Sequence, residues 1–364
     1  MGWIGLRDRS GARPAECKTV EMGAPGLRGL SDDALLARGT LAFELAFTDE
    51  EQVPRKLLEY ERFDGWQRRL TVYLNADYSL SVDCQQGSAH SYVRLSGVHP
   101  ENRSAVLVSC CWDAPERTGL LSVENLSNGA IRQAVFAAPI PLPAGDARRI
   151  LECSAHTRVD RNIRFLAISD RAEPIGPRPT IAAGALVETV DGPRPIERIR
   201  LGDQVVTQTG GPRKVRWILR QELPARGQST PITLRAPYFG LSNDITVTQE
   251  QKIVISGADT EYDFGRRALL VQARELIGHP GATVRCECTT MTCYQLLLDE
   301  HDCLLVSGAW LSSLFIGRLA LAPEVVATTG LAEVPASFLP VHPRHALPVL
   351  QPFEARALHH MLAG

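Results

Sequence analysis

Short runs in which apolar and polar residues alternate dominate the first half of the chain. Turns rich in Asn, Asp, Gly and Pro separate these runs, which cover residues 40–47, 70–74, 79–82, 105–109 and 120–124. A period of two places one face of each strand against a core and the other face in solvent. The pattern therefore predicts an antiparallel β-sandwich of the jelly-roll type over residues 31–151.

The segments on either side of this predicted sandwich have a different pattern. Residues 1–30 are rich in Gly, Pro and Arg without a steady period, which predicts a loose leader. One apolar strand at 163–168 precedes the run 170–179, in which three prolines and a glycine cannot sustain a helix or a central strand. We expect residues 152–179 to form a strand and a proline-rich joint, with the domain boundary between Ser169 and Ala183.

Alternating strands return in the second half. Asp191-Gly192 is a dipeptide typical of two-residue hairpin turns, so we expect positive φ at Gly192. The spacing of Ile196, Ile199 and Leu201 predicts an amphipathic turn that ends at Gly202 before the next strand. The predicted fold class is therefore mainly β throughout, with an all-β module at 180–320 and a tail at 321–364. The tail should carry one short helix near its end, over residues 352–361.

The composition is that of an ordinary globular protein. The 364 residues are 44% hydrophobic and 22% charged, which suggests two or three domains. A net charge of −2 gives no overall field to attract nucleic acid or an anionic membrane. Basic residues gather between Arg194 and Arg220, but Glu197 and Asp203 interrupt them, as is typical of a solvated sheet face.

The apolar runs are far shorter than the roughly 20 residues that span a bilayer, and the first residues do not form a secretory signal. We therefore expect no nucleic-acid partner, no membrane insertion and a cytoplasmic location by default. Export that is independent of a signal peptide is the alternative.

The nine cysteines do not predict a disulfide framework, because their number is odd and no export signal precedes them. A zinc site is one alternative, since several possible ligands lie close in sequence: Cys286, Cys288, Cys293, Cys303, His279 and His301. Their spacing lacks the paired Cys-x-x-Cys knuckles of structural zinc modules, which favours buried thiols. His359 and His360 fit a solvated helix end better than a metal site. Cys153 and His156 lack the third group of a hydrolase. We expect no metal and no other cofactor.

Residues 104–123 place a Trp-Asp turn between two predicted strands. This stretch resembles the laminin-G/concanavalin-type jelly rolls, and the resemblance implies a binding domain whose partner is often a glycan, sometimes held through calcium. The sequence offers no clustered carboxylate loop for calcium. Trp112 is expected in the core rather than as a platform for a sugar. The partner stays open between a protein and a glycan.

The segment 183–207 contains, in order, a strand, a Gly-containing hairpin, the turn Pro195-Ile-Glu-Arg-Ile199 and the run Gly202-Asp-Gln-Val205. These elements resemble the opening of Hedgehog/intein (Hint) modules. Further runs at 212–218, 235–241, 245–255 and 294–302 follow in the order seen in bacterial proteins of this class. The resemblance spans Thr180 to Gly317 and implies the Hint fold.

An active Hint module attacks the peptide bond before its own first residue with a Cys or Ser side chain. In this sequence Thr180 holds that position, after Pro179, and lacks the accessible thiolate of a cysteine. The family's Thr-x-x-His motif corresponds to Thr248-Gln-Glu-Gln251. A glutamine cannot deliver a proton, so general-acid help worth about 10²–10⁴-fold would be missing. Thr248 is a candidate donor to the oxyanion, or else a strand hydroxyl.

The third motif of the family, Asp-x-His, is present as Asp299-Glu300-His301. The resemblance implies that His301 is the base and Asp299 its orienting partner, and the alternative is a polar turn between strands. Because two of the catalytic positions are replaced, we expect a degenerate Hint protein that does not cleave itself and acts as a binding or assembly module. The alternative is an active autoprocessing protein that cleaves the Pro179–Thr180 bond by an N-to-O acyl shift.

Overall fold

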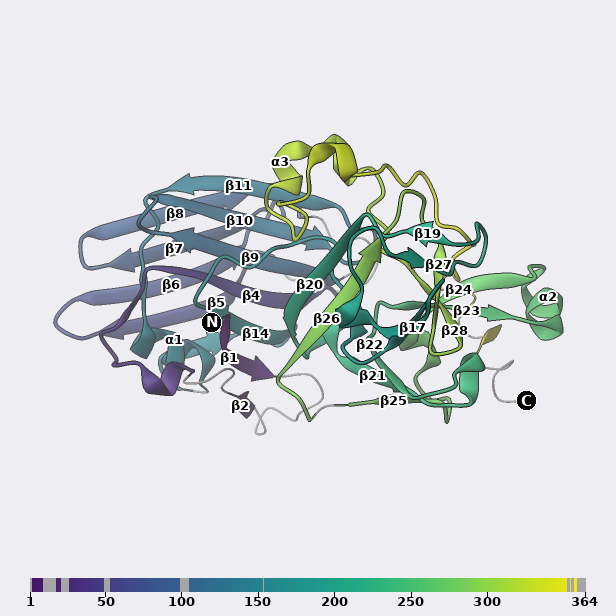
Figure 1. Ribbon diagram of the computed structural model, residues 1–364. Helices are drawn as coiled ribbons and strands as arrows, with labels where there is room; N and C mark the ends of the chain where they lie inside the picture. Colours follow the sequence, from purple (N-terminus) through teal and green to yellow (C-terminus); the bar gives the residue numbers. More distant parts are fainter. Residues whose placement is uncertain are drawn as a thin grey trace. The chain divides into compact units, whose positions relative to one another are not determined.

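The computed structural model describes residues 2–8, 18–20, 26–48, 53–98, 105–152, 154–285, 287–351, 354 and 357–358. The chain divides into two compact units, Met1–Gly176 and Pro177–Gly364. Figure 1 shows that strands dominate both units, and the paired strands are antiparallel throughout their sheets. The mainly β fold class predicted from the alternation is therefore confirmed.

The first unit is a β-sandwich. Its seven-stranded sheet has the order β11-β10-β9-β4-β14-β1-β2, its five-stranded sheet the order β13-β5-β6-β7-β8, and β12 pairs with β3. The bounds are β1 Trp3–Asp8, β2 Lys18–Val20, β3 Leu35–Leu36, β4 Arg38–Ala46, β5 Arg55–Phe63, β6 Gln67–Leu74, β7 Leu80–Gln86, β8 Ala89–Leu95, β9 Ala105–Asp113, β10 Thr118–Asn125, β11 Ile131–Ala137, β12 Leu142–Pro143, α1 Ala144–Leu151, β13 Thr157–Val159 and β14 Ile163–Ser169.

The core of this unit lies between the two sheets. Phe43 of β4 and Val72 of β6 belong to one buried cluster, although they come from opposite sheets. Along β6 buried and half-buried residues alternate strictly, as a strand with one face on a core requires. Complete burial of an aliphatic side chain such as Val72 contributes about 1.5–3 kcal/mol. Trp112 is buried, and its indole N–H donates to the carbonyl of Leu36 at 2.8 Å, so it is a core aromatic as expected.

The prediction of a loose leader is wrong for the described start of the chain. Residues Trp3–Asp8 form β1, which pairs with β14 in the register Leu6↔Ala167 and with β2 on its other side. Ile4 and Leu6 are buried on opposite faces of the sheet. The short apolar run was hidden in the sequence by neighbouring Gly and Arg residues. Both of its faces are covered, so the two-residue alternation that marks half-exposed strands is absent.

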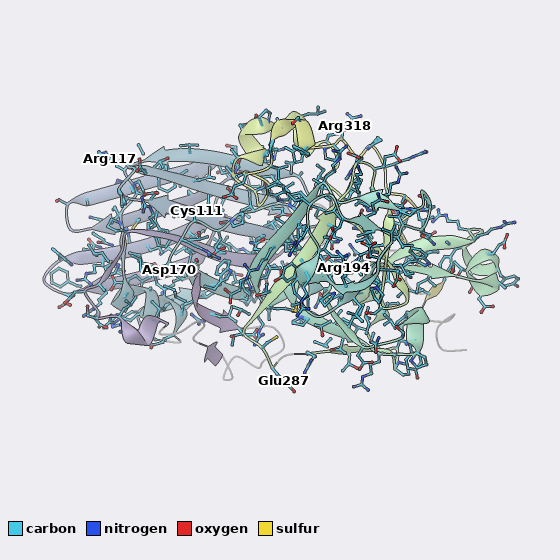
Figure 2. All side chains as sticks on the ribbon, in the orientation of Figure 1. Cys111, Arg117, Asp170, Arg194, Glu287 and Arg318 are labelled. Carbon is cyan, nitrogen blue, oxygen red and sulfur yellow. The ribbon has the colours of Figure 1, made fainter. Side chains whose placement is uncertain are left out.

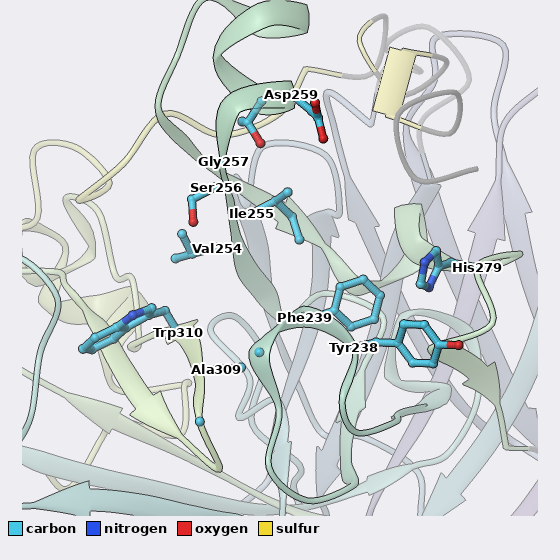
Figure 3. Close-up of a pocket in the computed structure, with 13 residues that line it drawn as sticks. Tyr238, Phe239, Val254, Ile255, Ser256, Gly257, Asp259, His279, Ala309 and Trp310 are labelled. Carbon is cyan, nitrogen blue, oxygen red and sulfur yellow. The ribbon is translucent and has the colours of Figure 1, made fainter. Parts of the chain in front are cut away.

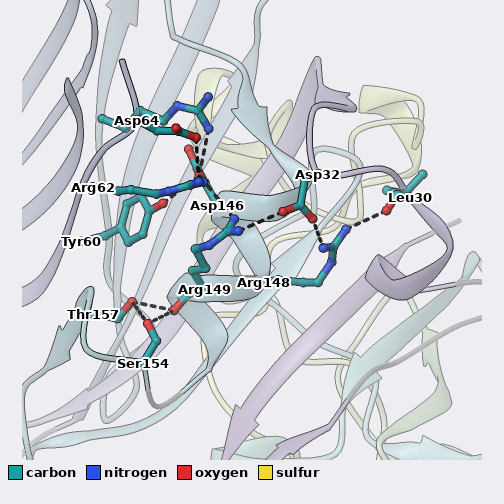
Figure 4. A network of polar contacts seen from close by, with 11 residues as sticks. Leu30, Asp32, Tyr60, Arg62, Asp64, Asp146, Arg148, Arg149, Ser154 and Thr157 are labelled. Atoms are coloured by element: carbon teal, nitrogen blue, oxygen red, sulfur yellow. Dashed lines mark hydrogen bonds and ion pairs between the residues drawn. The ribbon is translucent and has the colours of Figure 1, made fainter. Parts of the chain in front are cut away.

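A buried polar network fixes α1 to the five-stranded sheet (Figure 4). Asp146 of α1 is 1% exposed, and it accepts hydrogen bonds from the Tyr60 hydroxyl at 2.7 Å and from Nη1 of Arg68 at 3.2 Å. Burial, reinforced by Asp146, raises the pKa of Tyr60, so this hydroxyl stays a donor. Arg148 and Arg149 of the same helix bind Asp32. A buried carboxylate is tolerated here because each charge has partners.

The second unit contains two further antiparallel sheets. The six-stranded sheet has the order β20-β26-β15-β22-β21-β25, and the eight-stranded sheet the order β19-β18-β16-β27-β28-β23-β24 with β17 paired to β16. The bounds are β15 Ile181–Ala182, β16 Leu186–Thr189, β17 Gly192–Pro195, β18 Gln204–Val205, β19 Arg213–Lys214, β20 Trp217–Pro224, β21 Pro231–Leu234, β22 Ile245–Thr248, β23 Lys252–Ser256, α2 Ala258–Phe264, β24 Ala268–Gln272, β25 Ala282–Val284, β26 Thr290–Leu297, β27 Cys303–Val306, β28 Ala309–Ser312 and α3 Pro323–Val326.

The hairpin predicted at residues 191–192 is present with a shifted turn. Gly192 has φ 102°, which confirms the expected positive φ, but Thr189 pairs with Gly192, so Val190 and Asp191 are the two loop residues. The Thr189 hydroxyl donates to the carbonyl of Gly192 at 2.7 Å. Gly192 therefore stands just after the two-residue loop, in a regular register, at a positive φ that favours glycine.

The tail adds short elements to this unit. Leu270 N donates to the Pro348 carbonyl at 2.8 Å and Leu350 N to the Leu270 carbonyl at 2.8 Å, so the segment 348–350 runs along β24. Leu358 is buried in the core of the unit. Most of the helix expected at 352–361, together with Cys153, Cys286, His359 and His360, lies outside the described residues. Within the described part of the chain, no helix has the length and apolar character needed to cross a membrane.

Candidate functional site

The short strand β15 brings three of the predicted site residues together. Thr180 directly precedes β15, which lies between β26 and β22 in the six-stranded sheet. Thr248 ends β22, and its backbone N–H donates to the carbonyl of Thr180 at 2.8 Å. Gln251 follows in the turn before β23 and is 1% exposed. The sheet register therefore places Thr180, Thr248 and Gln251 in one buried polar cluster.

Hydrogen bonds fix the side chains of this cluster. The Thr180 hydroxyl donates to Oε1 of Gln251, and Nε2 of Gln295 donates to the same oxygen at 3.3 Å. Nε2 of Gln251 donates to the Lys252 carbonyl at 2.7 Å and to the Ser312 hydroxyl at 3.2 Å. Gln295 also donates to the Ser312 carbonyl at 2.9 Å. The amide of Gln251 is thus the centre of the network.

Two members of this cluster, Gln295 and Ser312, were not predicted from the sequence. Gln295 interrupts the apolar run of β26 and is 3% exposed, so a single polar residue inside a buried strand was the available signal. Ser312 ends β28 and is buried, and no pattern in the sequence relates it to Gln251. We call Thr180, Thr248, Gln251, Gln295 and Ser312 the Thr180 cluster.

The chemistry of the Thr180 cluster follows from its side chains, which are hydroxyls and primary amides. Whichever end of an amide faces a hydroxyl, the amide neither accepts nor releases a proton near neutral pH. The Thr180 hydroxyl therefore has a hydrogen-bond acceptor but no general base in this cluster. The Thr248 hydroxyl is buried and has no hydrogen-bond partner among the described residues. It could still donate to an oxyanion.

Asp299 and His301 lie in the turn between β26 and β27, and their partners differ from those expected. The Asp299 side chain is 53% exposed and pairs with Nε of Arg216 at 2.5 Å. His301 is 7% exposed, and its Nδ1 accepts a hydrogen bond from the backbone N–H of Ala346 at 3.0 Å. The expectation that Asp299 orients His301 is therefore corrected. The carboxylate reaches outward to a surface guanidinium, and the tail supplies the partner of the imidazole.

Burial controls the protonation of His301. Desolvation, followed by the charges of His345, His342 and Lys252, lowers the pKa of His301 to about 3. Since Nδ1 accepts a hydrogen bond, the neutral ring carries its hydrogen on Nε2. This nitrogen is buried without a partner among the described residues. At neutral pH His301 can supply a proton only by becoming an anion, and it is too weak a base to take one.

Two histidines of the tail pack beside His301. The His301 and His345 ring centroids are 4.9 Å apart, and Phe315 stacks on His345 at 3.8 Å. His342 is fixed at both nitrogens, by the carbonyl of Leu298 at 3.1 Å and the N–H of Ile316 at 3.4 Å. These rings line a cleft of about 1100 Å³. The segment Val341-His-Pro-Arg-His345 gave no periodic signal in the sequence, so this neighbourhood was not predicted.

The residues considered for zinc lie in different surroundings. Burial raises the pKa of Cys293 and of Cys303 to about 12 each, so both are protonated thiols. Within the described residues, no group of three or more His, Cys, Asp and Glu side chains is placed to hold a metal ion.

Some of the basic residues in the stretch 194–220 are paired with carboxylates. Arg194 binds Asp203 at 3.2 Å and Asp191 at 3.1 Å, and Arg213 binds Glu300 at 2.7 Å. Figure 2 marks Arg194 among the side chains of the second unit. Neighbouring acids therefore neutralise part of the local cluster of positive charge.

Comparisons with known proteins place this site in a family. The comparison with curated proteins returned no match. In structure the chain is weakly similar to a bacterial intein-like domain from Clostridium thermocellum, with 13% identity and a TM-score of 0.28, covering 37% of this chain and 98% of that one. It is weakly similar to the LG1–3 region of the laminin alpha2 chain, with 9% identity and a TM-score of 0.25, covering 87% of this chain and 57% of that one.

A third likeness is to tailspike protein 2 of a bacteriophage of Escherichia coli O157:H7, with 12% identity and a TM-score of 0.22. It covers 42% of this chain, which spans 20% of the tailspike. These structural likenesses are too weak to carry the assignment. The family model of the Hint domain matches residues 179–318, which include the whole Thr180 cluster, Asp299 and His301. Residues 179–318 of this chain are therefore a Hint domain.

Proposed function

We propose that this Hint domain is degenerate, that it does not cleave the chain before Thr180, and that the protein acts as a binding or assembly module. One observation carries the proposal. The hydroxyl in the nucleophile position donates to the amide of Gln251, the residue that replaces the proton-donating histidine of the family motif. Both side chains are buried, at 8% and 1% exposure, so bulk water does not substitute for the missing groups.

The proposal follows from the proton balance of the acyl shift. The Thr180 oxygen would have to lose its proton, attack the Pro179 carbonyl carbon and form an ester. The C–N bond between Pro179 and Thr180 would break, and the departing amine would need a proton. Gln251 can neither take the first proton nor supply the second. Each missing proton transfer removes help worth about 10²–10⁴-fold.

His301 does not compensate for this loss. Its Nδ1 is occupied by the Ala346 N–H, and its pKa of about 3 leaves it neutral and weakly basic at pH 7. Asp299, which could have raised that pKa, is engaged by Arg216 at the surface.

Residual self-cleavage at the Pro179–Thr180 bond is the second candidate. The unpartnered hydroxyl of Thr248 favours it, because a preorganised donor could stabilise the oxyanion of an N-to-O acyl shift. A hydroxyl nucleophile at Thr180 would then act slowly and without a general base.

Binding by the first unit is supported by exposed aromatic side chains at one hairpin. Phe63 and Trp66, at the turn between β5 and β6, are 77% and 55% exposed, and Arg68 lies 5.4 Å from the Trp66 ring. Exposed aromatic side chains of this kind are typical of contact surfaces for proteins or glycans. A glycan array probed with the full chain and with W66A distinguishes the two partners: signals that W66A loses identify a glycan.

Reinstating the family residues tests the proposal. The variants are T180C, Q251H and T180C/Q251H, and the matched control T180C/Q295H places the imidazole on the neighbouring amide position of the same cluster. In the presence of a thiol such as dithiothreitol, we expect the unmodified chain and T180C/Q295H to stay intact. In T180C/Q251H the Pro179 acyl group should move to the introduced sulfur, and the added thiol should cleave this thioester and release residues 1–179 and 180–364. Splitting of the unmodified chain would refute the proposal. An intact T180C/Q251H variant that folds would show that the loss lies elsewhere.

A further inference from the structure

A second pocket lies outside the Thr180 cluster in the unit Pro177–Gly364, which contains the Hint domain and is called the Hint unit below. It is bounded by the turn Tyr238–Gly240, the junction of β23 with α2, and the turn before β28 (Figure 3). Its volume is about 450 Å³, which is in the range of pockets that bind small organic ligands. Its residues have no part in the proposed function.

Three rings form one side of this pocket. Tyr238 and Phe239 each lie 5.0 Å from the His279 ring, centroid to centroid, with the Tyr238 ring edge-on to it. Figure 3 shows the three rings gathered on one side of Ile255, with Asp259 on the other. Burial lowers the pKa of His279, so its imidazole is uncharged at pH 7 and adds a third neutral ring. Aromatic faces carry negative electrostatic potential.

The backbone holds these rings in place before any ligand arrives. Phe239 has φ 58° and ψ 20°, a left-handed conformation that costs energy for a non-glycine residue. It is kept by the bonds Leu241 N–H to Tyr238 O at 3.0 Å and Ser242 N–H to Ser307 O at 2.7 Å. Nδ1 of His279 accepts the N–H of Gly281 at 3.0 Å, which fixes that ring. Such preorganisation lowers the entropic cost of binding.

The charged side chains described in this pocket are of negative sign only. Among the described residues that line it, Asp259 is the sole ionised group, and none is Lys or Arg. Asp259 forms no ion pair with any described residue, whereas Glu261 on the same helix lies 3.6 Å from Arg267. An anionic ligand would be repelled by the carboxylate and by the ring faces. A cationic ligand would gain from both.

We propose that this pocket binds an organic cation, an alkylammonium or alkylguanidinium group, with its carbon atoms against Tyr238 and Phe239 and its charge towards Asp259. This proposal goes beyond the proposed role as a binding or assembly module, because it names a ligand class. It does not depend on whether the Hint domain cleaves the chain. A basic side chain of a partner protein and a free amine share this chemistry.

Three small probes test the role of charge. Choline and ethylguanidine carry the cation, and 3,3-dimethylbutan-1-ol has the shape of choline without its charge. We expect saturable binding of at least one cation to the full chain in ligand-observed nuclear magnetic resonance, with far weaker binding of the neutral alcohol. Equal binding of choline and the alcohol, or no saturable binding of either cation, would overturn the proposal.

The helix α2 supplies matched control variants. D259N should weaken cation binding about threefold to fivefold, as expected for loss of one exposed charge pair, whereas D263N on the same helix should leave it unchanged. Y238A should weaken it similarly, and Y262A, which removes a tyrosine that is 90% exposed outside the pocket, should not. Asp259 and Tyr262 are exposed, so these variants should fold normally, which circular dichroism checks. Equal affinities of D259N and D263N would contradict the proposed contact.

Discussion

Acidification should destabilise the Hint unit through His301. The folded protein holds the pKa of this imidazole at about 3, first by burial and then by the charges of His345, His342 and Lys252. In the unfolded chain the ordinary value of about 6.5 applies. At a pH between these two pKa values, His301 is protonated in the unfolded state but not in the folded state. Stability therefore rises with pH across the window and is lost as the pH falls from about 6.5 towards 3.

The size of the effect follows from the distance between the two pKa values. At pH 4 the solution is about 2.5 pH units below the unfolded pKa, and each unit corresponds to about 1.4 kcal/mol, so His301 removes about 3 kcal/mol of stability. Its side chain is almost fully buried, which limits solvent screening of this cost. Burial also lowers the pKa of His345 to about 4, so the wild-type chain should lose more than the His301 contribution alone.

The substitution His301→Asn isolates the contribution. Asparagine can place an acceptor oxygen near the position of Nδ1, where it can receive the Ala346 N–H, but it does not titrate. Calorimetry of the full chain between pH 8 and pH 4 should show that H301N loses about 3 kcal/mol less than the wild type in the Hint transition. H156N, which removes an exposed histidine of the other unit, is the control and should follow the wild type.

A pH-independent offset of H301N is expected as well, since the ring contacts with Phe315 and His345 are lost. The test therefore rests on how steeply the stability of each protein changes with pH. If H301N and the wild type lost stability in parallel as the pH fell, the assignment of a buried neutral imidazole would be wrong.

Two further predictions concern single residues of the fold. G192V should destabilise the Hint unit by about 1–2 kcal/mol, because φ of 102° strains a residue with a Cβ, and an unchanged melting temperature would contradict the positive φ at this hairpin. D146A should destabilise the first unit by about 3–5 kcal/mol, because it leaves Arg68 buried without its carboxylate. Urea titration measures the unfolding free energy of D146A and of the control D77A. D77A removes an exposed partner of Arg94 and should have a far smaller effect. Equal losses for D146A and D77A would refute the buried network.

The fold class was predictable because alternation is a local property of the sequence. Strands with one buried face, such as β6, can be recognised from the alternation of apolar and polar residues with a period of two. The strand β1 was missed because both of its faces are covered and the alternation disappears. The predicted turn residues of the β16–β17 hairpin are one position away from the observed ones, because a glycine at positive φ fits both a primed turn and the position just after the loop.

The candidate site was predictable only as far as motifs extend. Thr180, Thr248 and Gln251 were found by their order in the family pattern, and the sheet register brings them together. Gln295 and Ser312 lie on other strands, and their bonds to Gln251 depend on tertiary packing. The partners of His301 come from a proline-rich tail without periodicity, so no local rule could relate residues 45 positions apart.

Intact-mass measurement of the purified chain tests the central claim most directly. The chain is incubated at neutral pH with and without a thiol or hydroxylamine, which would intercept an ester formed at Thr180 and so reveal even a stalled acyl shift. A buried hydroxyl that donates to Gln251 without a general base predicts a single species at the full mass of 39.9 kDa throughout. Appearance of fragments 1–179 and 180–364 would contradict it.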